Sequence, residues 1–242
     1  MTFADRFTTR ADAYAASRPL YPAAAIDAIL AGFDPATLVV ADLGAGTGIS
    51  SRSIAERGPR VLAIEPNAAM RGAAQPDARV FWIDGAAEAT TLAHHSIDMA
   101  VAFQAWHWFD QGPVVSEVRR IVRPGGRLGV VYNERDERDP FTAAYGEIVR
   151  RYATDATEQR RANALAHALA IDPARTIRSE FRNAQTLDRA GVHARAESSS
   201  YLPQAGPAAT AMHAEIDALF DRFGIGAALE MSLVTSVVAI EF

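Results

Sequence analysis

The chain has 242 residues, of which 49% are hydrophobic and 22% charged, a formal net charge of −5 and no cysteine. The absence of cysteine excludes disulfides and thiolate metal sites, and the scattered arginines form no basic stripe for nucleic acid. We expect a cytoplasmic globular protein with no membrane span, because the opening residues lack an apolar segment. The length suits one α/β unit with a sizeable core.

The N-terminal part contains one predicted helix and several aromatic residues. Pro22 introduces a helix over residues 23–30, and Tyr14, Arg18 and Tyr21 are interspersed with alanines upstream. One interpretation is an arm whose rings pack on the domain. The other is a lid over a ligand, in which Arg18 pairs with a ligand carboxylate and the two tyrosines contact substrate.

A strand, a tight glycine loop and a helix are predicted in residues 39–57. Gly44, Gly46 and Gly48 tolerate backbone angles that a side chain would block, and they let a ligand approach the backbone closely. A nucleotide-like ligand is therefore expected at the carboxyl end of the first strand. The spacing departs from the dinucleotide fingerprint G-x-G-x-x-G, because Ile49 stands where its third glycine would be.

Acidic residues near the ends of three predicted strands indicate which ligand the loop holds. Asp42 suits a cationic or amine-bearing ligand, and S-adenosylmethionine carries an ammonium and a sulfonium but no phosphate. Glu65 comes 23 residues later, about where an acid reaches ribose hydroxyls. Asp84 could accept a hydrogen bond from an adenine amino group, with Gly85 and Ala86 against the ring. Two alternatives stay open, a solvated strand-end carboxylate for Glu65 and a plain Asp-Gly turn for Asp84.

Further strand and helix segments follow in alternation. Residues 97–103 read as a fourth strand, and an amphipathic helix places apolar residues on one stripe over 114–122. The sequence RPGG at 123–126 breaks this helix, and 127–132 reads as a fifth strand. Strand and helix repeated five times predict a parallel sheet with helices on both faces.

These residues resemble the class I S-adenosylmethionine-dependent methyltransferases. Four motifs carry the resemblance over roughly residues 38–133, in the family's order and spacing. They are DLGAGTG at 42–48, AIEPN at 63–67 followed by Met70, DGAAE at 84–88, and RPGG at 123–126.

A looser resemblance covers flanking segments. Aromatic and Arg-Pro positions in residues 7–22, together with AWHWFD at 105–110, look like the small-molecule branch that includes trans-aconitate methyltransferase-like proteins. This branch does not fix a substrate. The family implies S-adenosylmethionine as cofactor, S-adenosylhomocysteine as product and a small-molecule substrate as partner. The expected cofactor-binding residues are Arg18, Asp42, Gly44, Ala45, Gly46, Glu65, Pro66, Met70, Asp84, Gly85, Ala86, Phe103 and Gln104.

In the second half of the chain, helical segments are expected outside the sheet, and two further strands are expected within it. Helical spacing covers residues 141–152, 157–170 and 212–223, while 179–186 and 233–242 read as strands. The last strand is apolar on both faces, which is typical of a buried strand.

By resemblance, the last strand inserts antiparallel beside the fifth. The expected fold is therefore a Rossmann-like α/β sheet of seven mostly parallel strands, with helical excursions that form a lid. We expect a single methyltransferase domain over 1–242. It divides into an N-terminal lid and helix (1–37), a cofactor-binding core (38–133), and substrate-side helices with the last two strands (134–242).

Methyl transfer needs a base only if the acceptor must lose a proton, and a carboxylate acceptor needs none. His107 is the best-placed candidate base, and the alternative is a structural histidine bonded to backbone. Trp106, an expected substrate contact, and Trp108 could wall a pocket or offer a face to the cation. No cluster has metal-ligand spacing, so no catalytic metal is expected.

Two other functions compete with a methyltransferase. A noncatalytic or regulatory S-adenosylmethionine-binding protein would keep the same motifs. A nicotinamide oxidoreductase is disfavoured by Ile49 and by the RPGG motif.

Overall fold

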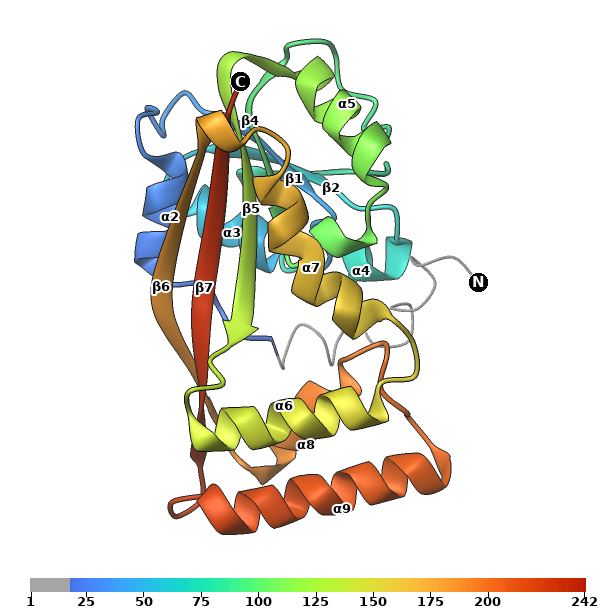
Figure 1. Cartoon of the computed structure of the whole chain (residues 1–242). Helices are drawn as coiled ribbons and strands as arrows, with labels where there is room; N and C mark the ends of the chain where they lie inside the picture. Colours follow the sequence, from blue (N-terminus) through green and yellow to red (C-terminus); the bar gives the residue numbers. More distant parts are fainter. Residues whose placement is uncertain (1–17) are drawn as a thin grey trace.

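The protein is described by a computed structural model that covers residues 18–242, so Tyr14, a predicted substrate contact, lies outside the described residues. Seven strands form one sheet in the order β3-β2-β1-β4-β5-β7-β6 (Figure 1). The strands are β1 (Val39–Leu43), β2 (Arg60–Ile64), β3 (Val80–Ile83), β4 (Ile97–Phe103), β5 (Val122–Arg135), β6 (Thr176–Leu187) and β7 (Leu229–Glu241).

The pairing of these strands confirms the expected fold class. β1 to β5 pair in parallel, whereas β7 runs antiparallel between β5 and β6. The surrounding helices are α2 (Ala23–Leu30), α3 (Ile49–Ala55), α4 (Ala68–Gly72), η2 (Trp106–Trp108), α5 (Gln111–Ile121), α6 (Pro140–Tyr152), α7 (Thr157–Leu169), η3 (Pro173–Arg175), α8 (Arg189–Glu197) and α9 (Gly206–Phe223).

Helices cover both faces of the sheet. Every residue of β4 is buried, and since the side chains of a strand alternate between the two faces, both faces must be covered. Ala100 and Ala102 join a core with α5 and α7, while Met99, Val101 and Phe103 join a core with α2 and α3. This two-sided burial explains why the strand reads as an unbroken apolar run.

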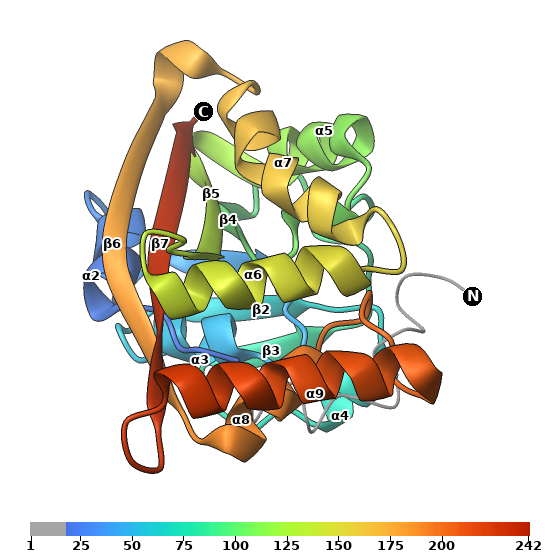
Figure 2. The same ribbon diagram turned by 60° about the horizontal axis from the view of Figure 1, so that its bottom comes forward.

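A third core lies beyond the end of the sheet. It joins α6, α8 and α9 to the nearby ends of β6 and β7. Figure 1 shows these helices together at the end where β5 stops, and Figure 2 shows α6 and α9 side by side. The helical excursions thus sit at the carboxyl end of the parallel strands, where ligands bind in open α/β sheets.

Two local expectations are wrong. The RPGG segment at 123–126 does not separate α5 from the fifth strand but lies within β5, as an irregularity in its pairing with β4. There, Gly125 N donates to Phe242 O, and Phe242 N donates to Gly126 O, which extends the ladder. In addition, the described residues 84–96 contain no helix, so the fivefold strand–helix repeat fails between β3 and β4.

The segment between β3 and β4 is held by tertiary hydrogen bonds instead of a helix. Thr90 donates to Glu117 Oε1 of α5 through its backbone N (2.8 Å) and its hydroxyl (2.6 Å). Thr91 and His95 have positive φ, of 65° and 50°, which an α-helix does not allow.

Candidate functional site

The glycine loop between β1 and α3 has a backbone that requires glycine. Gly44, Gly46 and Gly48 have φ of 67°, 59° and 75°. The Gly44 N–H donates to Ile64 O of β2 (2.9 Å), and a Cβ at Gly44 would lie 2.9 Å from Ala105 Cβ. Both the turn and the close approach of the backbone therefore depend on the absence of a side chain.

Glu65 follows β2 and fastens the glycine loop. Its Oε2 accepts from Gly46 N (3.0 Å) and its Oε1 from Asn67 N (2.8 Å). Burial raises the pKa of Glu65, against the opposing effect of these two hydrogen bonds. Since each carboxylate oxygen can accept more than one bond, Glu65 keeps capacity for a ligand hydroxyl.

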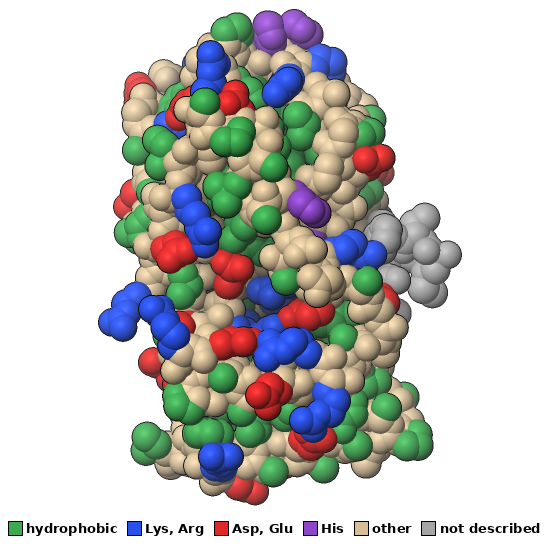
Figure 3. Space-filling model, in the orientation of Figure 1, with side chains coloured by type: hydrophobic (Ala, Val, Ile, Leu, Met, Phe, Trp, Pro, Cys, Tyr) green, Lys and Arg blue, Asp and Glu red, His purple; other side chains and the backbone are tan. Residues whose placement is uncertain are grey.

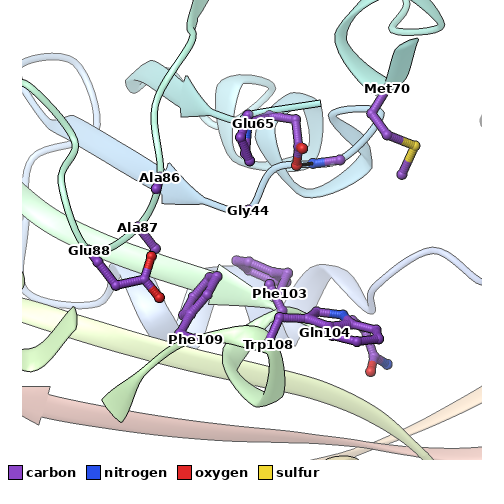
Figure 4. A pocket seen from close by; sticks show the side chains of 13 residues that line it. Gly44, Glu65, Met70, Ala86, Ala87, Glu88, Phe103, Gln104, Trp108 and Phe109 are labelled. Carbon is purple, nitrogen blue, oxygen red and sulfur yellow. Dashed lines mark hydrogen bonds between the residues drawn. The ribbon is translucent and has the colours of Figure 1, made fainter. Parts of the chain in front are cut away.

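A cavity of about 170 Å³ lies beside the loop (Figure 4). Gly44 and Glu65 lie on one side of it, and Phe103, Trp108 and Phe109 lie on the other. The predicted cofactor residues that the structure brings together here are Gly44, Gly46, Glu65, Pro66, Met70, Ala86, Phe103 and Gln104. Trp108, expected to wall a pocket, lines this cavity too. Sequence reasoning missed Ala87, Glu88, Ala105 and Phe109, although all belong to the DGAAE and AWHWFD motifs.

Asp42 lies behind the loop and does not line this cavity. Its Oδ2 accepts from the hydroxyls of Ser50 (2.7 Å) and Ser51 (2.6 Å), and the residue is fully buried. Asp42 therefore ties the end of β1 to α3. In this structure it supports the loop, and direct contact with a ligand stays a prediction.

Burial raises the pKa of Asp42 to about 6, although the hydrogen bonds from Ser51 and Ser50 oppose the rise. Because the pKa is higher in the folded protein than in the unfolded chain, the protonated Asp42 favours the folded state. This contribution to the free energy of unfolding is complete below pH 3.8, the ordinary pKa, and is lost as the pH rises through about 6. The free energy of unfolding of Asp42→Asn, relative to that of the natural protein, should therefore rise by about 2–3 kcal/mol from pH 4 to pH 8.

Thermal denaturation of both proteins at pH 4 and pH 8 measures this difference. Asp84→Asn, at a side chain that is 72% exposed, is the control. A stability gap between Asp42→Asn and the natural protein that does not change with pH would contradict the assignment.

Asp84 and Gly85 lie outside the cavity lining. The exposed Asp84 carboxylate pairs with Arg71 (2.9 Å), and the Arg71 guanidinium also donates to Glu65 O (2.5 Å). A Cβ on Gly85 would lie 3.4 Å from Ile64 Cγ2, so its backbone packs on β2. The predicted adenine contacts of these two residues stay predictions.

A second, smaller cavity adjoins the first and shares Gly44, Gly46, Phe103 and Gln104 with it. Here the structure places the predicted residues Arg18, Ala45 and Tyr21. The Tyr21 ring packs edge-on against Phe103, with centroids 4.7 Å apart.

Three arginines border the second cavity, and we call Arg18, Arg161 and Arg195 the arginine pocket. Sequence reasoning missed the last two, which lie on α7 and α8. Each guanidinium donates to a neutral oxygen. The bonds run from Arg18 to Ser198 O (3.3 Å), from Arg161 to Asn133 O (2.8 Å) and from Arg195 to Gln185 Oε1 (2.7 Å).

The arginine pocket carries an excess of positive charge. Burial, together with the charges of Arg18, Arg161 and Arg135, lowers the pKa of Arg195 to about 10. Within residues 18–242, neither Arg161 nor Arg195 forms an ion pair with a carboxylate. Because a buried charge is costly unless it is paired, this pocket favours an anion.

The arginine pocket also borders the molecular surface. Arg161 lines an open hollow of about 240 Å³, next to Arg135, Glu158 and Arg150. Figure 3 shows a hollow above α6 with basic side chains inside it and acidic ones around it. Arg135 is paired with Glu158, and against the effect of burial the charges of Arg135 and Arg161 lower the pKa of Glu158.

The predicted base His107 lies in η2 and borders a third small cavity with Arg18, Gln104, Trp108 and Arg161. Burial and the nearby arginines lower its pKa to about 3. A group with so low a pKa is a weak base at neutral pH. The structure therefore disfavours the predicted role as a base.

Trp106 is fully buried in the core between the sheet and α5, and its ring packs against Phe109. It does not wall a pocket, which corrects the predicted substrate contact. Trp108 lines both the cofactor-side cavity and the cavity beside His107. The short 3₁₀ turn places these two tryptophans in different surroundings, which the sequence WHW does not reveal.

Gln104 is the residue at which all three cavities meet. It has φ of 54°, which is uncommon for a residue other than glycine. Its backbone N donates to Val131 O (2.9 Å) and its side-chain Nε2 to Asn133 O (2.9 Å). Strained residues of this kind cluster at functional sites.

In the part of the chain that the structure describes, no three His, Asp or Glu side chains gather closely enough to hold a metal ion. Likewise, none of the helices in residues 18–242 combines the length and apolarity that crossing a membrane requires.

Known proteins share these motifs and this fold. Residues 41–130 match the family model described as a methyltransferase domain. An uncharacterized methyltransferase of Mycobacterium tuberculosis (strain H37Rv) is 42% identical over 148 residues, which cover 60% of this chain and 59% of that protein. An uncharacterized methyltransferase-like protein of Schizosaccharomyces pombe is 32% identical over 157 residues, covering 62% and 60%. The matches thus span about three fifths of these relatives.

A solved structure from Anaeromyxobacter dehalogenans, provisionally assigned as a type II methyltransferase, shows the same fold over nearly the whole chain. It superposes with a TM-score of 0.69 at 25% identity and covers 93% of this chain and 96% of its own. The resemblance to trans-aconitate methyltransferase-like proteins stays a prediction.

Proposed function

We propose that this chain, a class I methyltransferase by its sequence and fold, transfers the methyl group of S-adenosylmethionine to a small acceptor that carries a carboxylate. The observation that carries this proposal is the arginine pocket, which adjoins the glycine-loop cavity through Phe103 and Gln104.

The residues present fit the cofactor. A Cβ at Gly44 would press on Ala105 and Phe109 of the cavity wall, so the glycine keeps this wall in place, and the Glu65 carboxylate borders the same cavity. Met70 and Phe103 add apolar surface for an adenosyl group, while Pro66 adds to the wall. When bound, the cofactor supplies an electrophilic methyl group on a sulfonium, so the chain needs no metal to activate it.

The arginine pocket supports an anionic acceptor. Arg161 and Arg195 would bind a carboxylate by charge-assisted hydrogen bonds, which are stronger than neutral ones. The low pKa of His107 supports a nucleophile that needs no deprotonation, as a carboxylate oxygen is at neutral pH. The main contribution of the chain is then orientation and exclusion of water, and orientation alone can be worth up to about 7–11 kcal/mol.

A matched pair of acceptors tests this proposal. The purified chain is incubated with cofactor labelled on its methyl group and with a panel of small carboxylic acids, each beside its neutral amide. We expect transfer to at least one acid and at least about 100-fold slower transfer to its amide, because the amide leaves the buried charge of Arg195 without an anionic partner. Equal rates for acid and amide would contradict the anionic acceptor.

A regulatory protein that binds the cofactor without turnover is the alternative. It predicts binding of S-adenosylhomocysteine but no labelled product with carboxylic acids, phenols or amines. Transfer to any of these classes would exclude it.

A further inference from the structure

His107 lies between the two parts of the site. The small cavity that it borders shares Gln104 and Trp108 with the cofactor-side cavity, and shares Arg18 and Arg161 with the arginine pocket. A side chain in this place can reach an acceptor that is held by the arginines and directed toward the cofactor.

Tyr132 of β5 holds the His107 ring. Its hydroxyl oxygen accepts from the His107 backbone N–H (3.0 Å) and lies 2.8 Å from Nδ1. Tyr132 is 1% exposed, and its hydroxyl can either donate a hydrogen bond to Nδ1 or accept one from it, so this contact allows both tautomers of the neutral ring. With Nδ1 as the acceptor, the proton of the neutral imidazole sits on Nε2.

Burial, together with nearby positive charges, keeps the His107 ring neutral. Arg161 of α7 and Arg18 border the same cavity as the ring, Arg160 of α7 acts on it through its charge, and the Tyr132 hydroxyl of β5 lies 2.8 Å from Nδ1. Burial and these three cations lower the pKa of His107 to about 3. A ring with this pKa is uncharged at neutral pH, and with its proton on Nε2 it offers a donor instead of a base.

We propose that His107 is a positioning residue whose Nε2–H donates a hydrogen bond to the bound anionic acceptor and that the ring takes no proton during transfer. This inference rests on the proposed function. A hydrogen bond from the neutral ring to an anion is charge-assisted, and it orients the acceptor without any transfer of a proton.

Nitrogen NMR of the full chain, labelled with ¹⁵N-histidine and saturated with S-adenosylhomocysteine, tests the state of the ring. His107→Gln identifies the His107 signals. We expect the neutral Nε2–H form from pH 5.5 to pH 8.5. A proton on Nδ1, or a titration of the ring within this range, would overturn the inference. Failure of S-adenosylhomocysteine to bind, measured beforehand by calorimetry, would instead count against the proposed function.

Two variants test the donated bond with the acid that the labelled transfer assay identifies. His107→Gln keeps an N–H donor near the Nε2 position, and His107→Leu has none. We expect kcat/KM to stay within about tenfold for the glutamine variant and to fall about 10- to 100-fold further for the leucine variant.

The pH profile of kcat separates positioning from base catalysis. We expect no limb between pH 6 and pH 8.5 that depends on His107. Equal losses in both variants, or a limb that is present in the natural enzyme and disappears in His107→Gln, would overturn the inference.

Discussion

Arg195→Met is expected to stabilise the free protein and to lower kcat/KM for the anionic acceptor by at least about 100-fold. Arg195 is 8% exposed, and within the described chain it has no carboxylate partner. Methionine removes the cost of burying this charge, so unfolding should cost about 1 kcal/mol more. In the complex, removing one partner of a buried charge pair costs about 3–5 kcal/mol.

Thermal denaturation without acceptor and steady-state kinetics with it measure the two effects. Arg178→Met is the control, because Arg178 lies at the surface of β6 with a side chain that is 46% exposed. It should change neither quantity appreciably. A destabilised Arg195→Met protein that keeps full activity would contradict the assigned pocket.

Gly44→Ala is expected to weaken binding of S-adenosylhomocysteine by about 100-fold. The new Cβ would lie 2.9 Å from Ala105 Cβ and 3.1 Å from Phe109 Cζ, and both of these residues line the cavity. To relieve this contact, the wall must move toward the ligand's place, and a distortion of this size costs about 1–3 kcal/mol. Calorimetric titration measures the loss.

Gly125→Ala is the matched control for this variant. Gly125 also has a positive φ, of 80°, but no atom lies within 4 Å of the position that a Cβ would take there. Both substitutions place alanine in the left-handed region, which costs about 1–2 kcal/mol. Only Gly44→Ala should weaken binding, and an equal loss in both variants would show that strain, and not the cavity wall, sets the effect.

The sheet could be predicted because its strands carry local signals. Residues 97–103 are apolar throughout apart from Asp98, and β4 occupies this range because α2 and α3 cover one face while α5 and α7 cover the other. The glycine loop was predictable because its positive φ values demand glycine at fixed positions. Both signals depend only on residues that are close together in the sequence.

The arginine pocket could not be predicted, because it depends on how distant elements pack. Arg161 and Arg195 lie on different helices, and Arg161 follows a polar stretch that resembles a solvated helix face. Only the packing of α7 on the sheet and of α8 beyond its end brings them to Arg18. Similarly, the buried state of Trp106 depends on α5 and could not be distinguished from that of Trp108.

Binding of the cofactor product is the most direct test of the central claim that the glycine-loop cavity serves methyl transfer. Isothermal titration of the purified chain with S-adenosylhomocysteine and with NAD compares the two nucleotide classes that such a loop can hold. We predict saturable binding of S-adenosylhomocysteine with one site per chain, and no binding of NAD. Binding of NAD without binding of S-adenosylhomocysteine would contradict the account.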